Sequence, residues 1–159
     1  MDAFSVRTKI MIGGGMDALA QRLHRVFLVT DKFMAESGKT NYVTDRLLRS
    51  GGEFKIFSDV QADPDIATVT RGVEQILEFQ PDAVVAFGGG SAIDAAKAIV
   101  FFAARERDMR DCKFIAIPTT SGTGSEVSRF AVITDQEKGV KYPLVEDSCC
   151  PTSPFWTRS

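Results

Sequence analysis

Short runs of hydrophobic residues alternate with longer amphipathic stretches along this chain. Residues 26–30, 83–87 and 114–117 are three such runs, in which β-branched and aromatic side chains are frequent. Uninterrupted runs of this length are typical of strands that are buried on both faces of a parallel sheet. The segments between the runs are long enough for crossover helices. The pattern therefore predicts an α/β domain with a Rossmann-like parallel sheet flanked by helices.

Two of the intervening segments have the periodicity of helices. In residues 65–79, hydrophobic side chains recur at spacings of three and four, directly after Pro64. Asp63 is the predicted N-cap, because its carboxylate can accept a hydrogen bond from the first turn. Residues 91–104 are rich in alanine and hydrophobic on nearly every side, which predicts a second, well-buried helix.

Further strands are predicted before the first hydrophobic run and after the last one. Residues 9–12 predict an N-terminal strand that ends at the glycines of residues 13–15. Residues 131–134 and 140–142 predict a late β-hairpin. No linker composition interrupts the chain before about residue 145, so we expect one domain over residues 1–145.

A glycine-rich turn joins the second hydrophobic run to the buried helix, in the stretch GGGSAIDAAK that starts at Gly88. Glycines let the chain turn tightly and let a ligand come close to the backbone. The N-terminus of the following helix favours an anion, and Ser91 adds a hydroxyl group. A diphosphate fits these features. The alternative is a turn that only caps the helix, since the stretch matches neither GxGxxG nor the P-loop pattern.

A second loop, PTTSGTGSEV from Pro118, also follows a hydrophobic run. Ligands of open α/β sheets bind beyond the carboxyl ends of the strands, so the two loops are expected to meet at one crevice. A solvated turn rich in serine and threonine is the alternative for this loop alone. Both loops together favour a dinucleotide.

Asp31 ends the first hydrophobic run. A carboxylate at that position can accept hydrogen bonds from a ribose diol and would repel a 2′-phosphate, which favours NAD over NADP. The alternative is that Asp31 caps the helix that follows it.

Composition and charge exclude several classes of function. The 159 residues carry a formal net charge of −2, which gives no footprint for nucleic acid or an anionic membrane. No hydrophobic run approaches the roughly 20 residues of a membrane span, and no secretory signal is present, so a cytoplasmic protein is expected. His24 is the only histidine, so no cluster of imidazoles can hold a catalytic metal.

GGGSAIDAAKAI at residues 88–99 and PTTSGTGSEVSRFAVITD at residues 118–135 resemble the two signature stretches of the iron-containing, or group III, alcohol dehydrogenases. The resemblance covers roughly residues 4–145. Within the family, the chain looks closest to the propanol and ethanol dehydrogenases of bacterial microcompartments, so a microcompartment is a second possible location.

The resemblance implies an NAD(H)-dependent oxidoreductase that interconverts primary alcohols and aldehydes, commonly as a homodimer. The family's Fe²⁺ or Zn²⁺ is held by one aspartate and three histidines in an all-helical C-terminal domain, beyond the matched stretch, so this chain is expected to bind NAD without turnover. Carried over residue by residue, the cofactor-binding positions are Asp31 at the adenosine ribose; Gly89, Gly90, Ser91 and Asp94 at the diphosphate; Thr119, Thr120 and Thr123 on the adenine and ribose side; Lys141 at the nicotinamide ribose; and Phe130, which faces the cofactor at a position that varies among relatives.

Two other interpretations of the function remain open at this point. The glycerol dehydrogenases and dehydroquinate synthases share the architecture and use zinc, but PTTSGTGSEV argues against that branch. A non-catalytic dinucleotide-binding or assembly module is the third possibility.

Residues 146–159 look unlike the family, which would continue after residue 148 with a sequence such as LLPDIAILDPE. The chain reads CCPTSPFWTRS instead. One choice of codons for these residues encodes the family sequence once a single C is restored in front, so we expect a one-nucleotide deletion near codon 148. A chosen domain boundary with an unrelated tail is the alternative. With a deletion, Cys149, Cys150 and Trp156 have no evolved role, and a surface meant for the helical domain would favour self-association.

Overall fold

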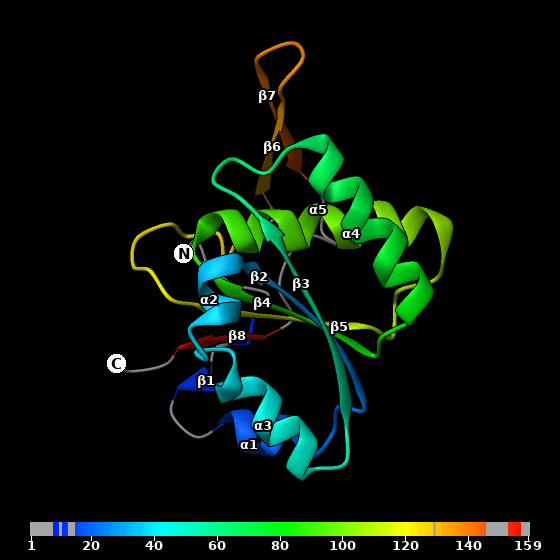
Figure 1. Cartoon of the computed structure of the whole chain (residues 1–159), viewed down its shortest axis with the longest axis vertical. Coiled ribbons are helices and arrows are strands. Elements are labelled where there is room, and N and C mark those ends of the chain that lie inside the picture. Colours follow the sequence, from blue (N-terminus) through cyan, green and yellow to red (C-terminus); the bar gives the residue numbers. More distant parts are fainter. Residues whose placement is uncertain (1–7, 10, 13–14, 129, 146–152, 157–159) are drawn as a thin grey trace, which may run out of the picture.

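A computed structural model of the chain describes residues 8–9, 11–12, 15–128, 130–145 and 153–156. These residues form a six-stranded parallel sheet in the order β1-β8-β5-β4-β2-β3 (Figure 1). The strands are β1 (Met11–Ile12), β2 (Arg25–Asp31), β3 (Glu53–Val60), β4 (Ala83–Gly88), β5 (Lys113–Pro118) and β8 (Ser153–Trp156).

The three hydrophobic runs form the central strands β2, β4 and β5, as predicted, and the Rossmann-like α/β class is confirmed. Strand β3 was not predicted. It lies at the edge of the sheet beside β2, and most of its side chains are only partly buried. Its sequence contains polar residues and therefore lacks the uninterrupted hydrophobic run by which the other strands were predicted, because an edge strand need not be hydrophobic on both faces.

Helices cover both faces of the sheet. On one face, Phe27, Val84 and Phe114 pack beneath α4 (Ile66–Phe79) and α5 (Gly90–Glu106). On the other, the alternate residues Leu28 and Val85 pack against α1 (Gly15–Ala20) and α3 (Asn41–Arg49). The short helix α2 (Lys32–Glu36) follows β2. None of the helices in the described part of the chain is long and apolar enough to cross a membrane.

The N-cap of helix α4 lies two residues after the predicted one. Asp65 is the N-cap, and its Oδ1 accepts a hydrogen bond from the N–H of Thr68 at 2.7 Å. Asp63 has a φ of +55° and belongs to the preceding turn, so the prediction that it caps the helix is wrong. Pro64 separates the two aspartates, and a carboxylate must lie directly before the first turn to reach its N–H groups.

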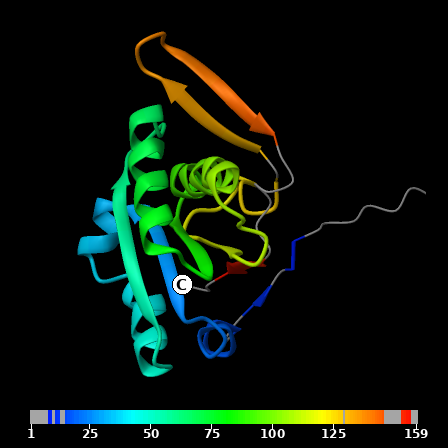
Figure 2. The same cartoon turned by 90° about the vertical axis from the view of Figure 1, so that its right-hand side faces the viewer.

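The predicted hairpin consists of β6 (Phe130–Asp135) and β7 (Val140–Val145), which pair in antiparallel fashion. Figures 1 and 2 show that it projects beyond the helical layer of α4 and α5, at the top of both views. The N–H of Thr134 donates to the carbonyl of Pro64 at 3.0 Å, which joins the hairpin to the loop before α4.

The terminal strands complete one side of the sheet. The predicted strand at residues 9–12 is seen as β1 over Met11–Ile12, whereas Ile10, Gly13 and Gly14 lie outside the described residues. Strand β8 comes from residues 146–159 and pairs with β1 and β5. Cys149 and Cys150 also lie outside the described residues, and the origin of this tail stays a prediction.

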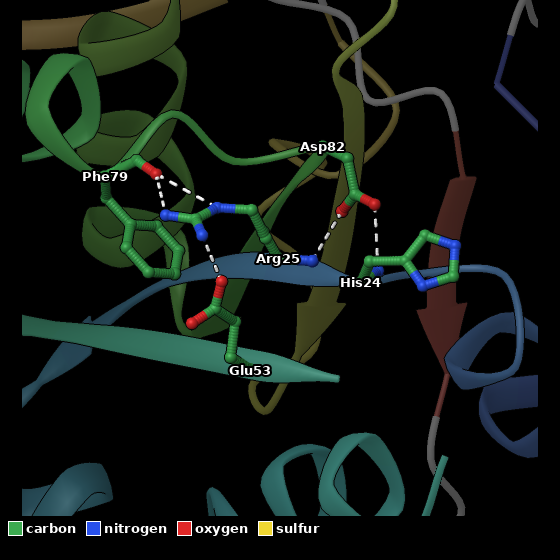
Figure 3. Close-up of polar contacts among 5 residues, drawn as sticks. All are labelled: His24, Arg25, Glu53, Phe79 and Asp82. Atoms are coloured by element: carbon green, nitrogen blue, oxygen red, sulfur yellow. Dashed lines mark hydrogen bonds and ion pairs between the residues drawn. The ribbon is translucent and has the colours of Figure 1, made fainter. Parts of the chain in front are cut away.

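A polar network holds the amino-terminal end of β2 (Figure 3). The two carboxylate oxygens of Asp82 accept the backbone N–H groups of His24 and Arg25, at 2.8 and 3.1 Å. The guanidinium of Arg25 bonds the carbonyl of Phe79 and forms an ion pair with Glu53. This network joins β2 to its neighbours β3 and β4 at the end of the sheet opposite Asp31.

Candidate cofactor-binding site

The strand order places a topological switch point between β2 and β4. The chain runs from β2 outward to β3, then returns across β2 to β4 and continues to β5. Crossover connections on opposite sides leave a crevice at the carboxyl ends of these two strands, which is where ligands of open α/β sheets bind. The Oγ1 of Thr30, which is buried, donates to the carbonyl of Phe87 at 2.7 Å and fixes the two strand ends together.

The turn after β4 requires glycine. Gly88 has a φ of +148°, and a Cβ atom there would lie 3.0 Å from the Cβ of Ala92. The same added atom would lie 3.7 Å from Oδ2 of Asp31, so this turn faces the end of β2. Helix α5 begins directly afterwards with Gly89 as its N-cap. The first N–H groups of a helix have no partners within the helix, so this terminus can bind an anion.

The two predicted loops meet, as their positions after neighbouring strands indicated. A Cβ on Gly89 would lie 3.3 Å from Oγ1 of Thr120, and one on Gly90 would lie 3.3 Å from Cγ2 of Thr123. The N–H of Thr119 donates to the carbonyl of Gly88 at 2.9 Å. Side chains at the two glycines would therefore crowd the contact between the glycine turn and the threonine-serine loop.

A crevice of about 340 Å³ lies at this junction. Six predicted cofactor-binding residues line it: Asp31, Gly89, Gly90, Ser91, Thr119 and Thr120. The remaining lining comes from residues that were not predicted, namely Met34, Val60, Gln61, Ala62 and Ala92. The crevice thus combines hydroxyl groups, a carboxylate and a helix N-terminus with apolar side chains.

Asp31 caps a helix and also lies in the crevice. Its Oδ1 accepts a hydrogen bond from the N–H of Met34 at 2.9 Å, so it is the N-cap of α2. Its side chain also lines the crevice, with Oδ2 turned toward Gly88. A carboxylate has capacity for several hydrogen bonds, so capping leaves Asp31 able to accept from a ligand.

Thr123 and Asp94 lie beside the crevice and make contacts within the protein. The hydroxyl of Thr123 donates to Oε2 of the buried Glu126 at 3.1 Å. Oδ2 of Asp94 accepts the N–H of Val132 at 3.3 Å, while its buried Oδ1 has no partner among the described residues. Burial raises the pKa of Asp94, and the Lys97 cation opposes that effect only in part.

Phe130 and Lys141 occupy the hairpin and do not line the crevice. They share its outer face, since Phe130 and Thr134 point the same way and Lys141 is paired with Thr134. Phe130 is 52% exposed. Nζ of Lys141 forms an ion pair with Asp63 at 2.8 Å, and Asp63 follows Ala62 of the crevice lining. The outer face of the hairpin therefore begins where the crevice ends.

A larger cavity of about 510 Å³ lies between α4, α5 and the inner face of the hairpin. Its lining is almost entirely apolar and includes Ile66, Val73, Phe102, Ile133 and Leu144. Among the described residues, the lining has no charged side chain and only the hydroxyl groups of Thr70 and Tyr142, so the smaller crevice is the better candidate for a diphosphate despite its size.

Sequence reasoning missed two buried polar residues that position the site, Thr30 and Lys97. Lys97 is completely buried in α5, and its Nζ donates to the carbonyls of Ser128 and Phe130, at 2.7 Å each. A signal did exist, because a lysine in an alanine-rich helix that is hydrophobic on nearly every side must either reach the surface or bind buried acceptors.

The described residues fit a dinucleotide but no catalytic metal. No group of three His, Cys, Asp or Glu side chains in the described ranges is arranged to hold a metal ion. His24 lies exposed before β2, at the opposite end of that strand from Asp31. The glycine cradle, the helix N-terminus and Asp31 are, in contrast, the groups that a diphosphate and a ribose require.

Comparisons with known proteins agree with this geometry. The family model for iron-containing alcohol dehydrogenase matches residues 8–155. A 1-propanol dehydrogenase of Citrobacter freundii is 42% identical over 153 residues, which cover 95% of this chain and 41% of that protein. The chain thus spans about two-fifths of the length of this curated relative.

Solved structures are similar over nearly the whole chain. The NAD⁺ complex of a sulfoacetaldehyde reductase from Bifidobacterium kashiwanohense has a TM-score of 0.83 and 31% identity, covering 98% of this chain and 46% of that one. An NADH-dependent butanol dehydrogenase from Thermotoga maritima has a TM-score of 0.85 and 26% identity, covering 98% and 44%. The resemblance seen in the sequence is confirmed, and the chain belongs to the iron-containing alcohol dehydrogenase family.

Proposed function

We propose that the chain binds NAD(H) in the crevice at the carboxyl ends of β2, β4 and β5. One observation carries the proposal: the glycine turn and the threonine-serine loop are in contact at the switch point, with the Asp31 carboxylate facing them. A sulfoacetaldehyde reductase with 31% identity is bound to NAD⁺, which supports the same ligand for this chain.

Each part of the crevice suits one part of the dinucleotide. The N-terminus of α5, with Gly90 and Ser91, would bind the diphosphate through backbone N–H groups and a hydroxyl group. Asp31 would accept the hydroxyl groups of the adenosine ribose, and Thr119 and Thr120 would line the adenine and ribose side. Phe130 and Lys141 on the outer face of the hairpin would meet the nicotinamide half.

The wider activity that we propose is the NAD(H)-dependent interconversion of a small primary alcohol and its aldehyde. The identity with a 1-propanol dehydrogenase favours a short alcohol. The microcompartment location rests on the resemblance seen in the sequence alone. Iron or zinc would polarise the alcohol oxygen in such a reaction. Because this sequence has one histidine, and that residue lies far from the crevice along β2, we propose that the chain alone binds cofactor without oxidising alcohol.

The test is calorimetric titration with NAD⁺ and with NADP⁺ of the wild type, Asp31→Asn and Asp31→Ala. Asparagine can still cap α2 through its side-chain oxygen but carries no charge against a 2′-phosphate. We expect the wild type to bind NAD⁺ at least about tenfold more tightly than NADP⁺, and Asp31→Asn to lose most of this preference.

Asp31→Ala separates the two roles of the carboxylate. It should lose the NAD⁺ preference and also about 1 kcal/mol of stability, because the cap of α2 is removed. Wild-type protein that binds neither nucleotide would refute the proposed site. Equal binding of both nucleotides by the wild type would refute the role of Asp31 alone.

A further inference from the structure

Lys97 is a charged side chain in the buried part of α5. Its exposed fraction is 0%, and its neighbours Ala96, Ala98 and Ile99 are buried as well. Burying an ammonium group is costly unless its donors are hydrogen-bonded, and an apolar side chain of similar volume is often equally stabilising. Stability of the core therefore does not explain why this position carries a cation.

The cation is bound to one short segment. Nζ donates to the carbonyl of Ser128 at 2.7 Å, to its hydroxyl oxygen at 3.3 Å and to the carbonyl of Phe130 at 2.7 Å. This segment lies between the threonine-serine loop and the start of β6. Lys97 thus fixes the chain at the point where the crevice loop continues into the hairpin.

A second charged residue of α5 holds the next part of the same strand. Asp94 lies one helical turn before Lys97, so the two side chains share a face of the helix. Its Oδ2 accepts the N–H of Val132 at 3.3 Å. The cation binds an outward carbonyl of β6 and the anion binds an outward N–H two residues later, which sets both the position and the register of Phe130 on α5.

We propose that Lys97 is a positioning residue for the nicotinamide half of the cofactor, acting through Phe130 and the outer face of the hairpin. The inference rests on the proposed NAD(H) site. The adenosine and diphosphate parts of that site lie on the ends of β2, β4 and β5 and on the first turn of α5, whereas the acceptors given above for Lys97, on Ser128 and Phe130, lie outside the residues that line the crevice. The hairpin is joined to the domain body by Lys97, by Asp94 and by the loop of Asp63 and Pro64.

The test compares two ligands that share one half. ADP contains the adenosine and the diphosphate, whereas NAD⁺ adds the nicotinamide riboside. Lys97→Met keeps the length of the side chain and removes the donors, leaving the carbonyls of Ser128 and Phe130 without this partner. We expect calorimetry to show NAD⁺ affinity about tenfold weaker in this variant and ADP affinity within about twofold of the wild type. Equal losses for both ligands would show a merely structural role and overturn the inference.

Phe130→Ala supplies the matched comparison. It should weaken NAD⁺ selectively as well, and adding Lys97→Met should cause little further loss, because both changes remove the same contact. Fully additive losses would overturn the inference, since Lys97 would then not act through Phe130. If Lys97→Met fails to fold by circular dichroism, Lys97→Arg replaces it. Arginine keeps the charge but displaces the donors. A loss of affinity for NAD⁺ alone would then support the inference, and an equal loss for NAD⁺ and ADP would overturn it.

The wild type separates this inference from the proposed function. Binding of neither ADP nor NAD⁺ would refute the crevice and, with it, the role of Lys97. Equal affinity for ADP and NAD⁺ would leave the crevice in place and overturn the inference, because the hairpin would then contribute nothing to the nicotinamide half.

Discussion

Asp94 is a carboxylate that the fold holds partly out of water, between α5 and β6. Burial raises its pKa, and the attraction of Lys97 and the hydrogen bond from Val132 only partly offset this. A carboxyl group with a pKa higher in the folded than in the unfolded chain stabilises the fold while it is protonated. That contribution is complete below the ordinary pKa of aspartate and is lost as the pH rises through the raised value.

Asp94→Asn should therefore alter how stability depends on pH. Asparagine keeps an oxygen for the N–H of Val132 but cannot ionise. Relative to the wild type, the free energy of unfolding of the variant should increase between about pH 3 and about pH 7. Urea unfolding at both pH values measures it, with Asp45→Asn on the exposed side of α3 as the control. A difference that is the same at both pH values would contradict the prediction.

Only some of the residues at the candidate site have positions that could be predicted from the sequence. Asp31, Gly89 and Thr119 could be predicted, because glycine, hydroxyl and carboxylate groups directly after a buried strand point to the ligand edge of the sheet. The sequence could indicate that Lys97 needs buried acceptors, but neither for Lys97 nor for Thr30 could it indicate which ones, because those acceptors are distant in the sequence. Thr30 bonds a carbonyl 57 residues away, and no local pattern indicates such a partner.

At the scale of elements, the start of α4 depends on a single N-cap residue, Asp65. Asp65→Ala should cost about 1 kcal/mol of stability, since the N–H of Thr68 loses its acceptor. That hydrogen bond lowers the pKa of Asp65, so its contribution is present above the ordinary pKa and is lost as the pH falls through the lowered value. The cost of the substitution should accordingly shrink in acid.

Asp63→Asn is the matched control for this helix, because asparagine tolerates the positive φ of that position and Asp63 caps nothing. It removes only an exposed ion pair with Lys141, so the loss should stay below about 1 kcal/mol. Thermal and urea unfolding of both variants compare the two aspartates. A larger loss for Asp63→Asn than for Asp65→Ala would restore Asp63 as the cap.

The hairpin could be predicted from its pattern, but the protection of its free edge could not. The N–H of Val132 is bonded to Asp94, so it points away from β7, and the residue opposite it, Pro143, lies at a non-hydrogen-bonded position. An N–H at that position would face the outer edge of β7, and proline has none. Pro143 therefore makes the edge a poor template for another strand.

At the scale of the whole molecule, the sequence indicated a parallel sheet but not the order of its strands. The three central strands are hydrophobic throughout, which marks them as buried without saying which are neighbours. The order follows from crossover connections and from the helices on each face. The site depends on that order, because only adjacency of β2 and β4 brings Asp31 to the glycine turn.

The helical layer of α4 and α5 depends on a close approach at Gly72. A Cβ atom there would lie 2.3 Å from Cδ1 and 2.6 Å from Cγ1 of Ile99, whose side chain is fully buried. Replacing glycine by alanine within a helix normally gains about 1 kcal/mol. Overpacking a filled core costs about 1–3 kcal/mol, so the clash should outweigh the gain.

Gly72→Ala should therefore destabilise the chain by up to about 2 kcal/mol in urea unfolding, which is the overpacking cost less the helical gain. In the background of Ile99→Ala the space is open, so the same substitution should become stabilising by about 1 kcal/mol. Thr70→Ala, at an exposed position of the same helix, tests alanine without the clash and should change stability by less than about 1 kcal/mol. A change in stability of the same sign in both backgrounds would contradict this prediction. It would mean that Ile99 does not limit how closely α4 and α5 pack.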